Sequence, residues 1–504
     1  MKKLLLTGLL PVAFGGLTSH AKSVENVKPN VIVIMADDLG YGDVSVYDRG
    51  TLKTPNMDRI GKEGIVFTNG YATSATCTPS RYSLITGEYP WRNDRAQVLA
   101  GDAPLLIDPA SPTLPKMLKK AGYQTAVIGK WHLGLGNGKV DWNKHIPLNP
   151  NDVGFDYSYI MAATNDRVPN VFVQDGKVVG LDPADPLYVS YRKNFEGEPT
   201  GKEHPEMLKM MYSHGHNQSI NNGVSRIGYQ KGGKAAQWID ENMADTFLVR
   251  SQNYIKKHKN KPFFLYYALH QPHVPRVPHS RFAGTTGMGP RGDAIAEADW
   301  CVGELLKTLD EEGLMENTIV IFSSDNGPVM DDGYKDDSQE KLGDHTPRGL
   351  LRGGKYSLFE AGTRVPFLLM WKGHVKGGKT SEALVCQVDL FASLAKMVNQ
   401  ELPNNDSQDI LPALTGKSKK GREGLIIEGL GHRTAYRKGD WVVIPAYKGS
   451  KMVSWGVSNE TGFNPTPEIQ FYNLKKDEKQ QDNLYSSMPE KAEELLKEME
   501  ELKK

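Results

Sequence analysis

The segment Cys77-Thr78-Pro79-Ser80-Arg81 brings a thiol, two hydroxyls and a permanent cation close together in the chain. Proline is favoured in the first turn of a helix, and helix N-termini attract anionic groups. The segment therefore predicts a helix that begins near Cys77 and places a reactive side chain where it can face an anionic substrate. Because a lone cysteine is more often a buried apolar residue, this interpretation depends on what surrounds it.

Two pairs of oxygen ligands lie far apart in the sequence. Asp37-Asp38 and Asp325-Asn326 each follow an apolar run. Carboxylate and amide oxygens suit calcium or magnesium better than zinc. Either pair alone is an ordinary turn or cap. If the two runs are strands of one sheet, the pairs together predict a metal site.

Cationic and basic side chains follow two other apolar runs. They are Lys130 and His132 after residues 125–128, and His270 and His273 after residues 262–267. A single lysine is usually solvated and a single buried histidine usually structural, but their shared position at strand ends favours acid–base chemistry. Prolines exclude a helix through the second segment, so its histidines are expected on a loop.

These apolar runs are the elements that must position the reactive groups. Runs of Val, Ile and Phe without polar alternation are typical of strands covered on both faces. They span residues 31–36, 125–128, 262–267 and 318–322. Ligands bind beyond the C-terminal ends of such parallel strands. With helical patterns at 55–63 and 115–120, the order of elements predicts an α/β fold with a large, mostly parallel sheet between helices.

The pattern changes after about residue 400. Loop-like segments lead into short strand patterns, and an apolar stripe of helical spacing closes the chain. The strand patterns cover residues 425–428, 434–436, 441–444 and 470–474. We therefore expect a catalytic domain over 22–400 and a smaller subdomain over 401–504, with an antiparallel sheet and a terminal helix. The irregular stretch at about 135–240 suits a substrate-binding surface.

Residues 1–21 have the pattern of a secretory signal peptide. Lys2 and Lys3 precede a mostly apolar stretch, and Ser19-His20-Ala21 provides small residues for cleavage. We expect a periplasmic or secreted protein. No later apolar stretch approaches the ~20 residues that span a bilayer, so membrane insertion is not expected. A formal net charge of +1 over 504 residues argues against a nucleic-acid partner.

Besides Cys77, the sequence holds two cysteines, which are few for an exported chain. Cys301 lies in a helical apolar pattern, and Cys386 lies in a similar run. Both are interpreted as buried thiols, with a disulfide between them as the alternative.

The reactive segments together resemble the formylglycine-dependent type I sulfatases, which have an alkaline-phosphatase-like fold. Residues 77–87 resemble C-x-P-S-R-x-x-L-x-T-G, residues 129–134 resemble G-K-W-H-x-G, and residues 270–275 resemble H-x-x-H-x-P. Residues 354–366 resemble G-K-x-x-x-x-E-G-G-x-R-x-P, with Ala361 in place of a glycine. These four elements, with the two oxygen-ligand pairs, cover residues 30 to about 370.

The resemblance implies a nucleophile that is no longer a cysteine. In that family a maturase oxidises the cysteine, here Cys77, to Cα-formylglycine. One hydroxyl of the hydrated aldehyde attacks sulfur, and deprotonating the other expels sulfate and restores the aldehyde, so one difficult step becomes two easier ones. Arg81 would hold this residue in place, and His132 would be the base on its second hydroxyl.

The resemblance also implies how sulfate and metal are bound. Lys130, Lys355 and His273 would contact the sulfate ester, and His273 would also protonate the leaving oxygen. One divalent cation, Ca²⁺ or Mg²⁺, would stabilise the deprotonated nucleophile. Its ligands would be Asp37, Asp38, Asp325, Asn326 and residue 77.

The motifs fix the chemistry but not the alcohol. Asp166, Arg167, His214 and His216 lie on loops with sugar-type hydrogen-bonding groups, and a surface ion pair is the alternative for Asp166 and Arg167. The chain resembles exported bacterial sulfatases acting on galactose or N-acetylgalactosamine sulfated at the 4-O or 6-O position. Two other functions remain open: a phosphate or phosphonate monoester hydrolase of the same superfamily, and a non-catalytic glycan-binding relative.

Overall fold

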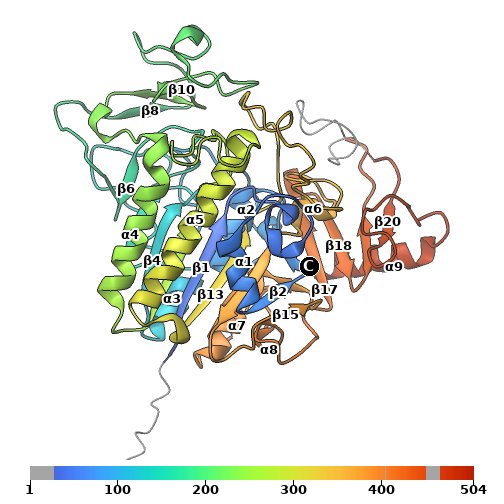
Figure 1. Cartoon of the computed structure of the whole chain (residues 1–504). Helices are drawn as coiled ribbons and strands as arrows, with labels where there is room; N and C mark the ends of the chain where they lie inside the picture. The colour runs from blue at the N-terminus through green and yellow to red at the C-terminus, as the bar shows by residue number, and fades with distance from the viewer. Residues whose placement is uncertain (1–27, 403, 450–465) are drawn as a thin grey trace, which may run out of the picture.

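A computed structural model describes residues 28–402, 404–449 and 466–504 (Figure 1). The predicted signal peptide, residues 1–21, lies outside these ranges. The centre of the structure is a ten-stranded sheet in the order β15-β2-β14-β13-β1-β12-β4-β5-β6-β7. Its strands are β1 (Asn30–Ala36), β2 (Ile65–Phe67), β4 (Gln124–Lys130), β5 (Tyr157–Met161), β6 (Phe172–Gln174), β7 (Lys177–Val178), β12 (Phe263–Ala268), β13 (Thr318–Ser324), β14 (Phe367–Trp371) and β15 (Lys379–Ser381).

The middle of the sheet confirms the predicted parallel architecture. The four predicted strands are adjacent, in the order β13-β1-β12-β4, and all are parallel, so their C-terminal ends meet at one edge. We call this the carboxyl edge. A fifth parallel strand, β5, lies inside the stretch expected to be irregular, where its five residues are too short for a clear periodic signal. The outer strands β14 and β6 run antiparallel to their inner neighbours.

Helices cover both faces of the sheet because its central strands are apolar on both sides. In β1, Val31 and Met35 pack in one buried cluster, while Ile32 and Ile34 pack in another. The first cluster includes side chains of α2 (Cys77–Thr86), α3 (Leu114–Lys120) and α7 (Leu390–Met397). The second includes those of α1 (Pro55–Lys62), α4 (Met243–His258) and α5 (Gly289–Glu311) (Figure 1).

The C-terminal region forms the expected smaller antiparallel sheet. It consists of β17 (Gly424–Glu428), β18 (Thr434–Lys438), β19 (Trp441–Ile444) and β20 (Gln470–Asn473), with helix α9 (Pro489–Leu502) packed against it. The end of β17 reaches the main sheet region, since Ala75 N–H donates to the Glu428 carbonyl at 2.7 Å. This places the small sheet directly beside the residues that precede Cys77.

All three cysteines are free and buried, so the alternative disulfide does not form. Cys301 lies in α5 as its helical pattern predicts. The helical interpretation of the run around Cys386 was wrong, because this residue ends the two-residue strand β16 (Val385–Cys386) before α7 begins. Within the described ranges, no helix combines the length and the apolar character that crossing a bilayer requires.

Candidate active site

Four strand ends bring the predicted polar residues together at the carboxyl edge. Asp37 follows β1, Lys130 ends β4, Asp325 follows β13, and His270 and His273 lie on the loop after β12. Backbone hydrogen bonds fix these ends against each other, with Asp325 N–H donating to the Ala36 carbonyl at 3.1 Å. At Gly129 an added Cβ would lie 1.8 Å from the Ala268 carbonyl oxygen, so only glycine permits β4 and β12 to approach just before Lys130.

Cys77 is the first residue of α2, as predicted. The preceding Thr76 has extended backbone angles, and the helix ends at Gly87 with φ of 72°. The thiol is 1% exposed, and its Sγ lies 3.3 Å from Nδ1 of His132. Burial raises the pKa of the Cys77 thiol, although the nearby Lys130 and Lys355 oppose this shift. Two lysines and the carboxylates of Asp37 and Asp325 therefore all act on the reactive position.

The hydrogen bonds of His132 orient one lone pair toward Cys77. Its Nε2 lies 2.8 Å from the Leu99 carbonyl, which only accepts, so Nε2 carries the proton and Nδ1 is free to accept one. Burial and the neighbouring Lys130 hold the pKa of His132 well below its ordinary value. The imidazole is therefore neutral at neutral pH and suited to act as a base on a group at position 77.

The acidic residues of β1 and β13 are paired with buried cations. Lys130 Nζ donates to both carboxylate oxygens of Asp37 at 2.7 Å. Arg81 Nη2 lies 2.7 Å from Asp325 Oδ2, and its Nη1 donates to Tyr266 Oη at 3.2 Å. Arg81 thus contacts the acidic cluster directly, whereas its interaction with Cys77 is electrostatic.

Asn326 provides the clearest sign that this cluster can hold a cation. Its Nδ2 donates to Asp38 Oδ1 at 2.7 Å, while its Oδ1 is buried without a hydrogen-bond partner. Burial raises the pKa of Asp37 well above its ordinary value, and the adjacent carboxylates of Asp325 and Asp38 raise it further. A buried, unpartnered acceptor beside three mutually repelling carboxylates fits a divalent cation.

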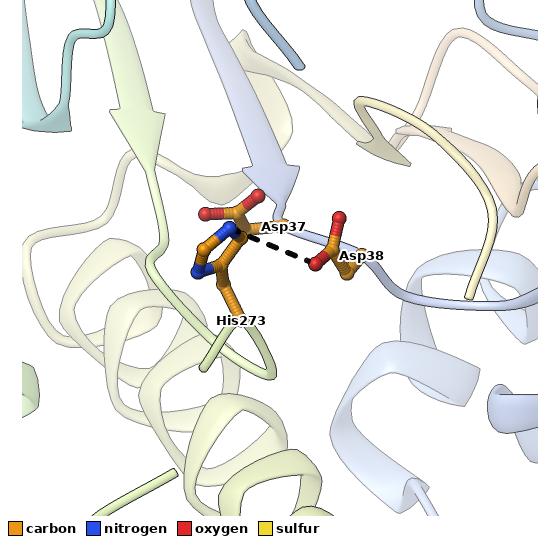
Figure 2. A group of neighbouring side chains, drawn as sticks. All are labelled: Asp37, Asp38 and His273. Atoms are coloured by element: carbon orange, nitrogen blue, oxygen red, sulfur yellow. Dashed lines mark ion pairs between the residues drawn. The ribbon is translucent and has the colours of Figure 1, made fainter. Parts of the chain in front are cut away.

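The oxygen-rich donor set fits a hard cation better than zinc. Figure 2 shows Asp37 and Asp38 at the end of β1, with His273 approaching from a neighbouring loop. One ligand atom from each of these three residues lies within 4.8 Å of the others, which is also a possible zinc arrangement. However, Asp325 and the unpartnered Asn326 oxygen belong to the same cluster, and oxygen donors in this number suit Ca²⁺ or Mg²⁺.

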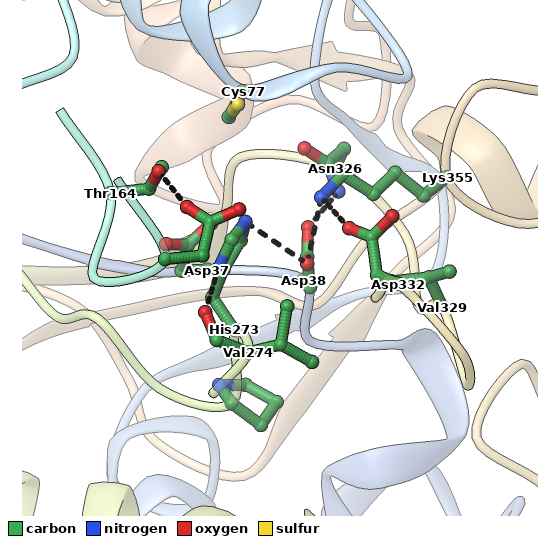
Figure 3. Close-up of polar contacts among 12 residues, drawn as sticks. Asp37, Asp38, Cys77, Thr164, His273, Val274, Asn326, Val329, Asp332 and Lys355 are labelled. Carbon is green, nitrogen blue, oxygen red and sulfur yellow. Dashed lines mark hydrogen bonds and ion pairs between the residues drawn. The ribbon is translucent and has the colours of Figure 1, made fainter. Parts of the chain in front are cut away.

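Lys355 joins the cluster from the opposite side, together with an aspartate that the sequence analysis missed. Its Nζ donates to Asp38 Oδ2 at 2.9 Å and to Asp332 Oδ2 at 2.8 Å (Figure 3). Tyr356 Oη donates to Asp332 Oδ1 at 2.9 Å. The sequence signal for Asp332 is only an acidic pair in a loop, because the contact depends on two loops meeting in space.

His273 approaches the same acidic cluster from the loop after β12. Its Nδ1 donates to the Val274 carbonyl at 2.7 Å, so the opposite nitrogen, 3.8 Å from Asp38 Oδ2, faces the cluster (Figure 3). Burial and Lys355 hold the pKa of His273 well below its ordinary value. Burial also lowers the pKa of His270, to about 3, and its ring packs against Phe247. His270 is therefore a structural neighbour of the site.

Three of the four predicted substrate residues lie close to this centre. Asp166 Oδ1 accepts from Arg167 Nη1 at 2.9 Å, and its Oδ2 accepts from His216 Nε2 at 2.9 Å. The positive charge of Arg167 reaches His132, where it helps to lower the pKa. His214 lies further out, with Nδ1 3.8 Å from Asp331 Oδ1. Asp166 and His216 are buried and the Arg167 side chain is 17% exposed, so this network is not the surface ion pair considered as the alternative.

Strained backbone marks three positions of the site. Asp38, His132 and Tyr356 have φ of 63°, 53° and 76°, in the left-handed region that non-glycine residues rarely adopt. Such conformations cost about 1–3 kcal/mol each and persist where the surrounding structure fixes them. Each of these residues directs a polar group at the centre, so the strain is located where chemistry is expected.

Comparison with known proteins assigns this arrangement to a family. The profile of the Sulfatase family matches residues 29–399. An N-acetylgalactosamine-6-O-sulfatase of Bacteroides thetaiotaomicron is 48% identical over 480 residues, covering 94% of this chain and 93% of the relative. Human arylsulfatase A is 32% identical over 410 residues, covering 79% of this chain and 70% of its own length.

Solved structures agree with this assignment. A structure from a study of glycosaminoglycan metabolism by Bacteroides thetaiotaomicron superimposes with a TM-score of 0.92 at 47% identity, covering 94% of this chain and 99% of that one. A phosphonate monoester hydrolase of Agrobacterium radiobacter superimposes with a TM-score of 0.55 at 16% identity, covering 94% of this chain and 95% of that one. The second likeness extends to the fold alone.

Proposed function

The chain belongs to the sulfatase family and is a sulfuric ester hydrolase, and we propose that it removes the 6-O-sulfate of N-acetylgalactosamine or galactose in glycans. The observation that carries the proposal is the neutral His132 facing position 77 at the start of α2, beside a buried acidic cluster. The choice of sugar is supported by the 48% identity to an N-acetylgalactosamine-6-O-sulfatase. The predicted 4-O position stays a candidate in the assay below.

We propose that Cys77 is oxidised to Cα-formylglycine by a maturase. The modified residue would supply a hydrated aldehyde whose hydroxyl is the nucleophile. His132 Nδ1, with its lone pair toward position 77, would accept a proton there, while the Leu99 carbonyl holds the ring in the required tautomer. Arg81 would stabilise negative charge at position 77 from the other side of the cluster.

Asp37, Asp38, Asp325 and Asn326 would hold the cation, with residue 77 as a further ligand, and Ca²⁺ is the proposed ion. The cation would polarise a sulfate oxygen and stabilise the deprotonated nucleophile. Lys130 and Lys355, on opposite sides of the acidic cluster, would bind the remaining sulfate oxygens. His273 would donate a proton to the leaving oxygen, because an anionic substrate beside it raises the pKa that burial and Lys355 depress.

Asp166 and Arg167 are proposed to bind the sugar hydroxyls. Asp166 accepts from His216 and Arg167, so a sugar hydroxyl can donate to the carboxylate while another accepts from the guanidinium. His214 is proposed to contact a more distant part of the glycan, since it lies toward Asp331. The carboxylate and guanidinium would then select the sugar, while the cation and lysines act on sulfate.

We propose export through the signal peptide at residues 1–21, a catalytic domain over 22–400 and a C-terminal subdomain over 401–504. The C-terminal subdomain contributes to the site, because its Leu430 N–H donates to the Tyr356 carbonyl at 3.0 Å. This hydrogen bond would hold the turn that carries Lys355 in place.

Two measurements test the proposal. Mass spectrometry of the tryptic peptide Glu63–Arg81 from the native host should find an aldehyde or its hydrate at position 77, and Cys77→Ala should abolish turnover. A screen of singly sulfated monosaccharides should then favour 6-sulfated N-acetylgalactosamine or galactose over the 4-sulfated sugars and over phosphate monoesters. An unmodified thiol in active enzyme would refute the nucleophile, and activity confined to aryl sulfates would refute the glycan assignment.

A further inference from the structure

Asp332 is a buried carboxylate at the edge of the site, and it has no role in the proposed mechanism. It is 6% exposed and lies in the loop after β13, between the metal ligands and the turn that carries Lys355. Its Oδ2 accepts from Lys355 Nζ at 2.8 Å (Figure 3). Its Oδ1 accepts from Tyr356 Oη at 2.9 Å. Both carboxylate oxygens therefore accept hydrogen bonds from two adjacent residues of one turn, Lys355 and Tyr356.

The contacts of Lys355 explain why a second carboxylate is needed. A lysine ammonium has three N–H donors, and two of them are directed to Asp38 and Asp332. Asp38 is also a proposed ligand of the cation, so its negative charge is shared between Lys355 and the cation. Among the described hydrogen bonds and ion pairs, Asp332 contacts Lys355 and Tyr356 and none of the four proposed protein ligands. The negative charge of Asp332 therefore remains available to Lys355 whether or not a cation is bound.

We propose that Asp332 is a positioning residue for the sulfate-binding Lys355. With the ammonium held between two carboxylates, its third N–H points to a fixed place, and the long flexible side chain does not have to be ordered by the substrate. Tyr356 fixes the rotation of the Asp332 carboxylate through its hydroxyl. The inference rests on the proposed function, in which Lys355 contacts the sulfate group.

A positioning role makes a prediction that a sugar-binding role does not. Lys355 would touch sulfate, which is common to all substrates, so removing the charge of Asp332 must weaken every sulfate ester equally. If Asp332 contacted the sugar instead, a small aryl sulfate would be unaffected. A purely structural role would lower thermal stability without a specific loss of sulfate affinity.

The test compares Asp332→Asn with wild type on 6-sulfated N-acetylgalactosamine and on 4-nitrophenyl sulfate. We expect kcat/KM to fall about 10- to 100-fold on both, as for other groups that orient a ligand-binding side chain, with weaker inhibition by free sulfate. Asp332→Glu should recover part of the loss, and Tyr356→Phe should give a smaller loss of the same pattern. Asp337→Asn is the control, since this exposed carboxylate of the same loop pairs with Lys341.

A double-mutant cycle separates this inference from the proposed function. In a Lys355→Met background, Asp332→Asn should cause no further loss, because its effect passes through the absent ammonium. A full additional loss in that background, or a loss on the sugar substrate alone, overturns the positioning role. Unchanged activity of Lys355→Met itself would instead overturn the proposed sulfate contact. If Asp332→Asn does not fold, Tyr356→Phe carries the same comparison.

Discussion

Cys77 Sγ lies 3.3 Å from His132 Nδ1, while Nε2 of the same ring lies 2.8 Å from the Leu99 carbonyl oxygen. The carbonyl holds the proton on Nε2, so the nitrogen that faces position 77 is a proton acceptor. The two residues come from a helix start and a strand end that are 55 positions apart. Their geometry assigns the direction of proton transfer before any substrate is considered.

His132→Ala should lower kcat on a sulfate ester by about 100- to 10,000-fold with little change in KM, because it removes a base and not a binding group. Steady-state kinetics on 4-nitrophenyl sulfate measures this. His374→Ala is the matched control, since that exposed histidine follows β14 at the opposite edge of the sheet. A parallel rise in KM would indicate a binding role for His132 instead.

The sequence predicted the residues that follow buried strands because both signals are local. A continuous apolar run identifies the strand, and the next polar residue must then lie at its end, as for Asp37 and Asp325. The order β13-β1-β12-β4 brought these ends together as expected. Predicting which strands lie side by side therefore also predicted which polar residues lie together.

Contacts between loops could not be predicted in this way. Asp332 meets Lys355 across two irregular segments, and Asp166 meets His216 from positions 50 residues apart. Neither loop has a periodicity that fixes its path, so the partner of each carboxylate is decided by tertiary packing. The short strand β5 was missed for the same reason, because its pairing with β4 and not its pattern makes it a strand.

Asn326→Ala should weaken cation binding, because it removes the buried oxygen that has no other partner. Saturating wild type with Ca²⁺ at about 100 times the dissociation constant should stabilise it by about 2.7 kcal/mol. Thermal unfolding after chelation and Ca²⁺ addition measures this directly, without relying on turnover. The variant should show a smaller rise in Tm at the same Ca²⁺ concentration.

The control for Asn326 is Asn317→Ala, which lies just before the opposite end of the same strand. Its Tm should rise with Ca²⁺ as much as that of wild type. Equal Ca²⁺ responses in Asn326→Ala and wild type would show that the asparagine oxygen is not a ligand. Parallel titrations with Mg²⁺ and Zn²⁺ would rank the three ions for this site.

Arg167→Ala should reduce kcat/KM on 6-sulfated N-acetylgalactosamine about 10- to 100-fold, since a hydrogen bond to a charged group contributes roughly 1.5–3 kcal/mol. The loss on 4-nitrophenyl sulfate should be much smaller, because that substrate has no sugar hydroxyls. Arg59→Ala on α1 is the control, as this side chain pairs with Asp310 away from the carboxyl edge. Equal losses on both substrates would mean that Arg167 acts on the sulfate or on His132.

Glu297 gives a prediction about pH and stability. This buried carboxyl of α5 accepts from His279 N–H at 2.9 Å and from Gln271 Nε2 at 3.0 Å, and burial raises its pKa to about 7. Arg281 opposes the shift and Asp245 adds to it, but neither forms a hydrogen bond with Glu297 among the described residues.

The direction of the pH dependence of stability follows from comparing the pKa of Glu297 in the folded and unfolded states. The folded pKa of about 7 lies above the ordinary value of 4.5, so the folded chain binds more protons between these values, and stability falls as pH rises through this window. Glu297→Gln removes this dependence and should raise Tm relative to wild type at pH 8 more than at pH 5. The full shift corresponds to about 3 kcal/mol as an upper bound. Thermal unfolding of both proteins at the two pH values measures the difference, and an equal Tm offset at pH 5 and pH 8 would contradict a raised pKa. Because Gln271 lies on the same loop as His273, kcat at neutral pH should be followed in the same variant.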